Sequence, residues 1–113
     1  MTAPKLNRML KLEERQQTPD GAGGFSEAWV TLGTLWAQID SRTGREAARR
    51  PAAMVSLTNL RITVRGAPAG HPQRPKPDQR FRDGSRIYRI LAVTERDPDA
   101  RFLTCFADEE VGA

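Results

Sequence analysis

Short runs in which apolar and polar residues alternate dominate this chain. In residues 60–65, three apolar residues alternate with three polar ones, as in a strand with one buried and one solvated face. Residues 28–40 are rich in tryptophan, valine, threonine and leucine, which suit a pleated sheet. Residues 6–15 fit a helical spacing and an alternating strand nearly equally well. The turn that follows them favours the strand.

Glycine and proline separate these runs. In the stretch TPDGAGG (18–24), Pro19 fixes its own φ, the side chain of Asp20 can bond the nearby backbone, and the glycines tolerate positive φ. This stretch therefore predicts the turn of a hairpin. Gly33 interrupts the alternation of the next run, which predicts a β-bulge. Further turns are expected at Asp83-Gly84 and at 97–100.

The pattern predicts a mainly β fold: a small antiparallel β-barrel of about five or six strands, formed by a single domain over residues 1–113. A sandwich would give a similar pattern. A basic loop is expected at 41–53, a Pro-rich arm at 66–79, and a frayed tail after residue 107. The residues expected to build the core are Trp29, Trp36, Ile39, Ile62, Tyr88 and Ile90.

The Pro-rich arm contains four prolines in fourteen residues, namely Pro68, Pro72, Pro75 and Pro77. Proline lacks the amide donor that a central strand needs. The arm is therefore expected to be an exposed loop with polyproline character.

The net charge of +4 is unevenly distributed. Residues 1–41 carry a net charge of −1, residues 42–89 carry +9, and residues 90–113 carry −4. This division predicts a basic surface for a polyanion and an acidic surface for a basic neighbour, which could be a second copy of the chain. One cysteine excludes an internal disulfide. We expect no secretory leader and no membrane span, because no long apolar run is present.

Candidate catalytic groups are sparse. The glycine cluster lacks the Gly-Lys-Ser/Thr ending of a phosphate-binding loop. His71 has no second ligand type nearby, and Cys105 lies in an apolar run typical of a small core residue. Asp97 and Asp99 flank a proline, as in a solvated turn. We therefore predict a protein without catalytic activity, cofactor or bound metal. Trp29 and Trp36 could stack on bases, but a core role is favoured because few other large residues are present.

Four arginines crowd one nine-residue stretch, offset only by Glu46: Arg42, Arg45, Arg49 and Arg50. A solvated basic loop without a partner would have this composition. Contact with nucleic-acid phosphate is favoured, because the arginine fork matches phosphate and such contact needs no base readout.

Several short motifs occur in a characteristic order along the chain. They are an opening strand from Leu6 to Arg8; the turn residues Thr18, Asp20, Gly21, Gly23 and Gly24; Trp29 and then Trp36-Ala37-x-Ile39; Ser41-x-x-Gly44-Arg45-Glu46; Arg61-Ile62-Thr63-x-Arg65; and Gly84-x-x-Ile87-Tyr88-x-Ile90. Together they cover residues 6 to 107. In this order the chain resembles the head-tail joining proteins, also called head-completion or stopper proteins, of long-tailed bacteriophages and gene transfer agents.

The resemblance implies a non-catalytic structural role at the head–tail junction of a virion or phage-like particle, after synthesis in the bacterial cytoplasm. It implies a six- or twelve-fold ring of identical chains, with a portal-adaptor ring above and tail terminator or tail tube proteins below. Packaged double-stranded DNA would fill the channel and face the loop at 41–53 through its four arginines. The prolines of the Pro-rich arm would pack on an adjacent subunit or ring.

A second hypothesis comes from the residues alone. A cytoplasmic, non-specific nucleic-acid-binding module with an oligonucleotide-binding-type barrel would have similar strands and basic loops. Assembly separates the two hypotheses, because such a module binds as a monomer with a steep salt dependence.

Overall fold

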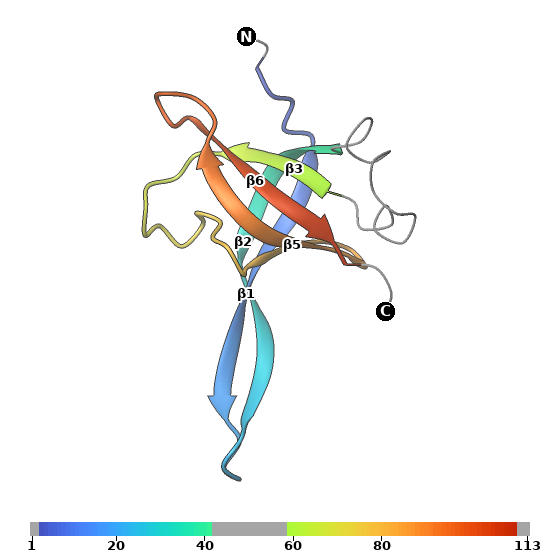
Figure 1. Cartoon of the computed structure of the whole chain (residues 1–113), viewed down its shortest axis with the longest axis vertical. Helices are drawn as coiled ribbons and strands as arrows, with labels where there is room; N and C mark the ends of the chain where they lie inside the picture. Colours follow the sequence, from blue (N-terminus) through green and yellow to red (C-terminus); the bar gives the residue numbers. More distant parts are fainter. Residues whose placement is uncertain (1–2, 42–58, 111–113) are drawn as a thin grey trace.

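A computed structural model describes residues 3–41 and 59–110 and contains six antiparallel strands (Figure 1). They are β1 (Arg8–Pro19), β2 (Phe25–Ser41), β3 (Asn59–Arg65), β4 (Arg80–Asp83), β5 (Arg86–Glu95) and β6 (Phe102–Glu109). Their order in the sheet is β1-β2-β3-β6-β5-β4. The sheet closes in a ring because Lys11–Glu13 of β1 pair with Arg80–Arg82 of β4. The predicted small antiparallel β-barrel is confirmed.

The turns lie at the positions that were predicted from glycine and proline. Between β1 and β2, Asp20 Oδ1 accepts hydrogen bonds from the amides of Ala22 (2.8 Å) and Gly24 (3.1 Å). Gly21 and Gly23 both have positive φ in this turn. The pairing of β1 with β2 shifts register between Leu12 and Glu13, opposite Gly33 and Thr31, which is the predicted bulge.

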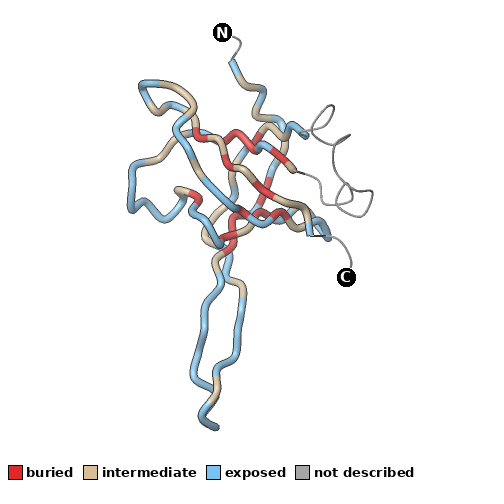
Figure 2. The backbone as a smooth tube through the Cα atoms, viewed as in Figure 1, coloured by how far each residue is buried: buried red, intermediate tan, exposed pale blue. Residues whose placement is uncertain are grey.

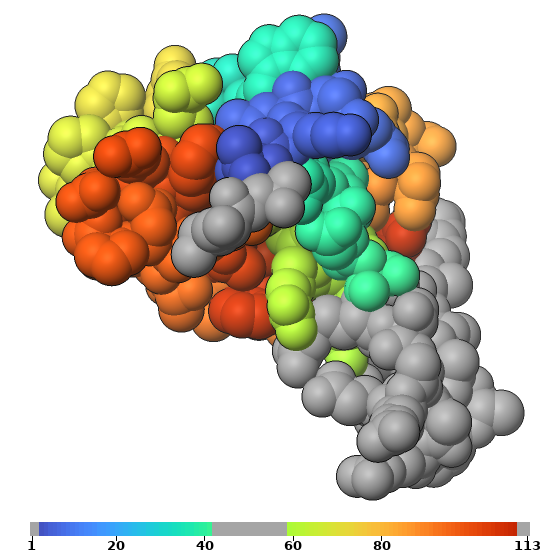
Figure 3. All heavy atoms as spheres, turned by 90° about the horizontal axis from the view of Figure 1, so that it is seen from above, coloured from blue at the N-terminus to red at the C-terminus, as the bar shows by residue number. Residues whose placement is uncertain are grey.

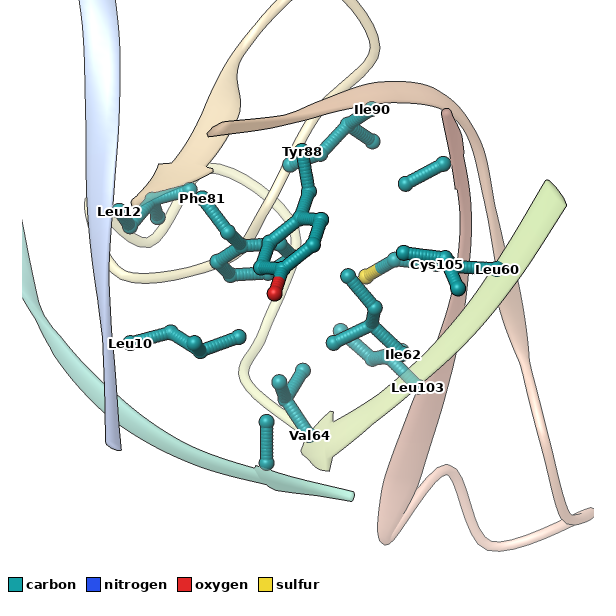
Figure 4. Packing of buried hydrophobic residues seen from close by; sticks show 12 residues of the cluster. Leu10, Leu12, Leu60, Ile62, Val64, Phe81, Tyr88, Ile90, Leu103 and Cys105 are labelled. Atoms are coloured by element: carbon teal, nitrogen blue, oxygen red, sulfur yellow. The ribbon is translucent and has the colours of Figure 1, made fainter. Parts of the chain in front are cut away.

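The core consists of twelve buried apolar residues on the strands of the sheet, and their side chains point into the interior (Figure 4). They are Leu10, Leu12, Ala37, Leu60, Ile62, Val64, Phe81, Tyr88, Ile90, Leu103, Cys105 and Ala107. Figure 2 colours the buried positions red along the backbone. Ile62, Tyr88 and Ile90 are buried where the sequence placed them, and Ile39 packs partly buried against the cluster. Burial raises the pKa of the Cys105 thiol to about 12, so this thiol stays protonated at neutral pH and acts as a small apolar residue.

The placement of Trp36 in the core is wrong. Its side chain is 55% exposed. After the bulge, Leu35, Ala37 and Ile39 face inward, so the alternation of the strand turns Trp36 outward. Trp29 is half-buried and lies outside the core cluster, because its part of β2 continues beyond the closed sheet. Leucine, valine and phenylalanine fill the space that was assigned to the tryptophans.

The C-terminal segment is more ordered than expected. β6 continues to Glu109. The carboxylate of Glu109 accepts two hydrogen bonds from the guanidinium of Arg86 on β5, at 2.8 and 2.9 Å. The hydrogen bonds from Arg86 hold the pKa of Glu109 below its usual range. Fraying after residue 107 is therefore contradicted for residues 108–110.

The Pro-rich arm is a loop, as predicted, but it is not exposed throughout. Pro75 is fully buried within its own chain. The arm folds back on the barrel because the amide of Asp78 donates to the carbonyl of Ile90, and the amide of Ile90 donates to the carbonyl of Gln79. Pro75 therefore cannot serve as an interface residue, which corrects that assignment.

Candidate functional site

The β1–β2 hairpin continues well beyond the closed sheet (Figure 1). The pairing of β1 with β4 stops at Glu13, and the pairing of β2 with β3 starts only at Ala37. Residues 14–31, the hairpin extension, therefore form a two-stranded ribbon whose residues are almost all exposed (Figure 2). An isolated two-stranded ribbon is marginally stable in water, so the extension depends on its attachment to the barrel.

A charged cluster holds the hairpin extension at its root, where β4 closes the sheet against β1. The side chain of Glu13 is only 6% exposed, and its Oε1 accepts a 2.7 Å hydrogen bond from Nε of Arg80. Arg82 lies 3.7 Å from the other carboxylate oxygen. The guanidinium of Arg80 also stacks over the ring of Trp29, 3.9 Å from its centroid. Trp29 thus anchors the extension to the barrel through a cation–π contact.

The tip of the extension presents an aromatic side chain. Phe25 is 67% exposed and pairs across the strands with Pro19. Sequence reasoning treated the glycine turn only as a connection and missed Phe25. The available signal was a large apolar residue directly after the turn, where a simple solvated hairpin would carry a polar one.

A groove lies on the outer surface of the barrel, between β2 and the start of the Pro-rich arm. It has a volume of about 650 Å³ and is lined by Leu6, Thr34, Trp36, Arg65, Pro68 and His71, among others. Met9 lies directly across the strands from Trp36 and is 58% exposed, so two large apolar side chains face solvent beside each other. We call this region the outer groove.

The end of the barrel away from the hairpin extension is covered by the N-terminal segment, which lies across it in Figure 3. The amide of Lys5 donates a 2.6 Å hydrogen bond to Oε1 of Gln38 on β2. Nearby, Asp97 caps the β5–β6 turn by accepting hydrogen bonds from the amides of Arg101 and Phe102. The Asp97 and Asp99 pair thus belongs to a turn, as the sequence indicated.

The remaining predicted site residues are divided between described and undescribed parts of the chain. Pro68, Pro72 and Pro77 are exposed in the Pro-rich arm. Arg42, Arg45, Arg49 and Arg50 lie outside the described residues. Within residues 3–41 and 59–110, no group of three or more His, Cys, Asp and Glu side chains is placed to hold a metal ion. No helix in the same part of the chain is long and apolar enough to cross a membrane.

Comparison with known proteins decides the family. The model of the phage head completion protein family matches residues 1–110. The chain belongs to the phage head completion protein family. It is a structural component of a phage or phage-like virion, located in the head–tail region.

Two solved structures are similar to this member of the family. A chain in the virion of a native gene transfer agent particle is 47% identical, with a TM-score of 0.77, over 98% of this chain and 100% of that chain. Protein SF1141 from Shigella flexneri 2a is 21% identical, with a TM-score of 0.72 over the full length of both chains, and shares the fold. No curated protein matches this head completion protein.

Proposed function

We propose that this chain forms the head-completion, or stopper, ring of its particle. The ring continues the portal channel, retains packaged DNA and provides the surface to which the tail attaches. The observation that carries this proposal is the family match over residues 1–110, supported by the 47% identity to a chain of a gene transfer agent virion. The same match favours this function over a free nucleic-acid-binding module.

The role is structural and needs no reaction. The thiol of Cys105 is buried and protonated. The carboxylates of Glu13 and Glu109 bond arginine side chains, and that of Asp97 bonds turn amides. These groups hold the barrel together. We propose that the chain acts by assembly, without catalysis.

The partners follow from this role. Identical chains form a six- or twelve-fold ring, with the portal-adaptor ring above, tail terminator or tail tube proteins below, and double-stranded DNA in the channel. The exposed prolines of the arm, Pro68, Pro72 and Pro77, offer a surface to an adjacent subunit or ring. The uneven charge along the sequence supports acid-to-base contacts between copies.

The segment 42–50 supplies the contact with DNA. Its four arginines are repeated in every copy of the ring, and duplex DNA carries one negative charge per roughly 1.7 Å of its axis. Contacts to phosphate alone do not depend on sequence, so the ring can hold and later release any DNA end. We place Arg42, Arg45, Arg49 and Arg50 at the channel.

We expect replacement of these four arginines by glutamine to leave the barrel folded, and to release DNA from filled heads before a tail attaches. The described barrel, residues 3–41 and 59–110, does not include these arginines, whereas the summed phosphate contacts would hold the DNA. Protection of DNA from nuclease in purified heads measures the effect.

A matched control removes the same charge elsewhere. K11Q, R61Q, R89Q and R101Q change exposed residues of the strands and of the β5–β6 turn, and this control should retain DNA. The arginine segment is not the gate if the 42–50 variant retains DNA as well as the control does.

A further inference from the structure

We propose that the tip of the hairpin extension of one copy docks in the outer groove of the next copy, with Phe25 against Trp36. This inference rests on the proposed ring and names the contact that builds it. The two surfaces lie on one chain, so a second copy of the chain is the partner.

The tip of the hairpin extension presents an exposed aromatic side chain on a fixed support. Phe25 is 67% exposed, more than any other large apolar residue among those described. The turn behind it is fixed by the two hydrogen bonds to the carboxylate of Asp20. The root of the extension is fixed by the contacts of Glu13 and Trp29 with Arg80. A projection fixed at both ends loses little conformational entropy on binding.

The outer groove is shaped to receive it. Trp36 and Met9 form an exposed cross-strand pair on the outer face of β1 and β2, with exposed fractions of 55% and 58%. Pro68 lines the same groove. An aromatic side chain buried beside Trp36 would gain apolar burial and a ring–ring contact, a combination found at the centres of protein interfaces.

The charges of the two surfaces are complementary. The hairpin extension carries Glu14, Asp20 and Glu27 against the single cation Arg15, a net charge of −2. The groove is lined by the cation Arg65, and its described lining contains no carboxylate. Opposite charge on the two surfaces orients the approach and disfavours contact between two tips or between two grooves.

The geometry makes the contact intermolecular. Phe25 and Trp36 lie on the same strand, eleven positions apart, which separates them by roughly 35 Å of extended chain. In Figure 1 the tip points away from the barrel and from the Pro-rich arm (yellow) that borders the groove. Because the tip and the outer groove lie at separate places on one chain, their contact joins copies head to tail. Such copies form a closed ring when the rotation from one copy to the next is a whole fraction of a full turn.

Cross-linking inside assembled particles tests this contact. The double variant A22C/H71C keeps Phe25 and places one thiol at the exposed Ala22 of the tip and another at the exposed His71 in the groove. The buried thiol of Cys105 gives little background. We expect mild oxidation to produce a ladder of covalent oligomers of this chain on a non-reducing gel. The control A22C/L91C, whose second thiol is exposed on β5, should give no ladder.

A second variant pair tests the energetics without a cross-link. F25S should lower the number of copies incorporated into particles by roughly tenfold, as loss of a central interface aromatic does, whereas F25L should restore most of it. Because Phe25 is exposed at the tip, F25S should unfold at the same denaturant concentration as the parent.

The outcomes separate this inference from the proposed function. A ring at the head–tail junction whose position-22 thiol cross-links to another protein overturns the inference and leaves the function in place. Normal incorporation of F25S into particles also overturns the inference and leaves the proposed function in place. Particles in which the chain forms no ring overturn both.

Discussion

Replacement of Glu13 by alanine should destabilise the barrel by about 3 kcal/mol, because breaking a buried ion pair leaves one charge uncompensated. The carboxylate of Glu13 lies 2.7 Å from Nε of Arg80, and the two side chains are only 6% and 12% exposed. Glu13 and Arg80 are also paired residues where β4 closes the sheet. Their loss should therefore loosen both the closure and the root of the hairpin extension.

Denaturant unfolding measures the loss. In a W36F background, tryptophan fluorescence reports on the root, because the ring of Trp29 stacks on Arg80. Glu27 is the matched control, since it lies 3.8 Å from Arg15 in an ion pair whose side chains are about half exposed. The substitution E27A should cost less than about 1 kcal/mol. Equal effects of E13A and E27A would contradict the structural role of the root cluster.

Replacement of Gly66 by alanine should cost about 2 kcal/mol, within the range found when a well-packed site is overfilled. Gly66 follows β3 and donates a 2.6 Å hydrogen bond to the carbonyl of Arg101. A Cβ at Gly66 would overlap the carbonyl oxygen of Ala100, which is a backbone atom of the neighbouring turn. The backbone cannot move aside as a side chain can, so the turn before β6 must shift.

The bulge glycine provides the comparison. A Cβ at Gly33 would meet the side-chain amide of Gln73, which can rotate away. We therefore expect G33A to change the free energy of unfolding by less than about 0.5 kcal/mol, as for a tolerated surface substitution. Thermal or denaturant unfolding of both variants measures the difference. If G66A unfolds no more easily than G33A, the close approach at Gly66 does not exist in solution.

The local features of the fold could be predicted from the sequence. Alternation in residues 60–65 identifies the inward face of β3, because a strand repeats every two residues. The turn at 18–24 and the bulge at Gly33 follow from the conformations that glycine and proline allow. These features depend on neighbouring residues in the chain.

Features that depend on distant pairing could not be predicted. The hairpin extension exists because β4 reaches only Lys11–Glu13 of β1, and nothing local to β1 determines the length of β4. Burial of Pro75 depends likewise on the hydrogen bonds between the Pro-rich arm and Ile90.

The error at Trp36 has a different origin. The neighbours Leu35, Ala37 and Ile39 already indicated which face turns inward. Residue size was given more weight than this alternation. The same outward-facing tryptophan lines the outer groove, the surface for which we propose docking of a second copy.

Cryo-electron microscopy of the assembled particle tests the central claim most directly. We predict density for this chain as a closed six- or twelve-fold ring at the head–tail junction, with the segment 42–50 of every copy facing the DNA channel. Single isolated copies, or copies distributed over the head shell, would contradict the account.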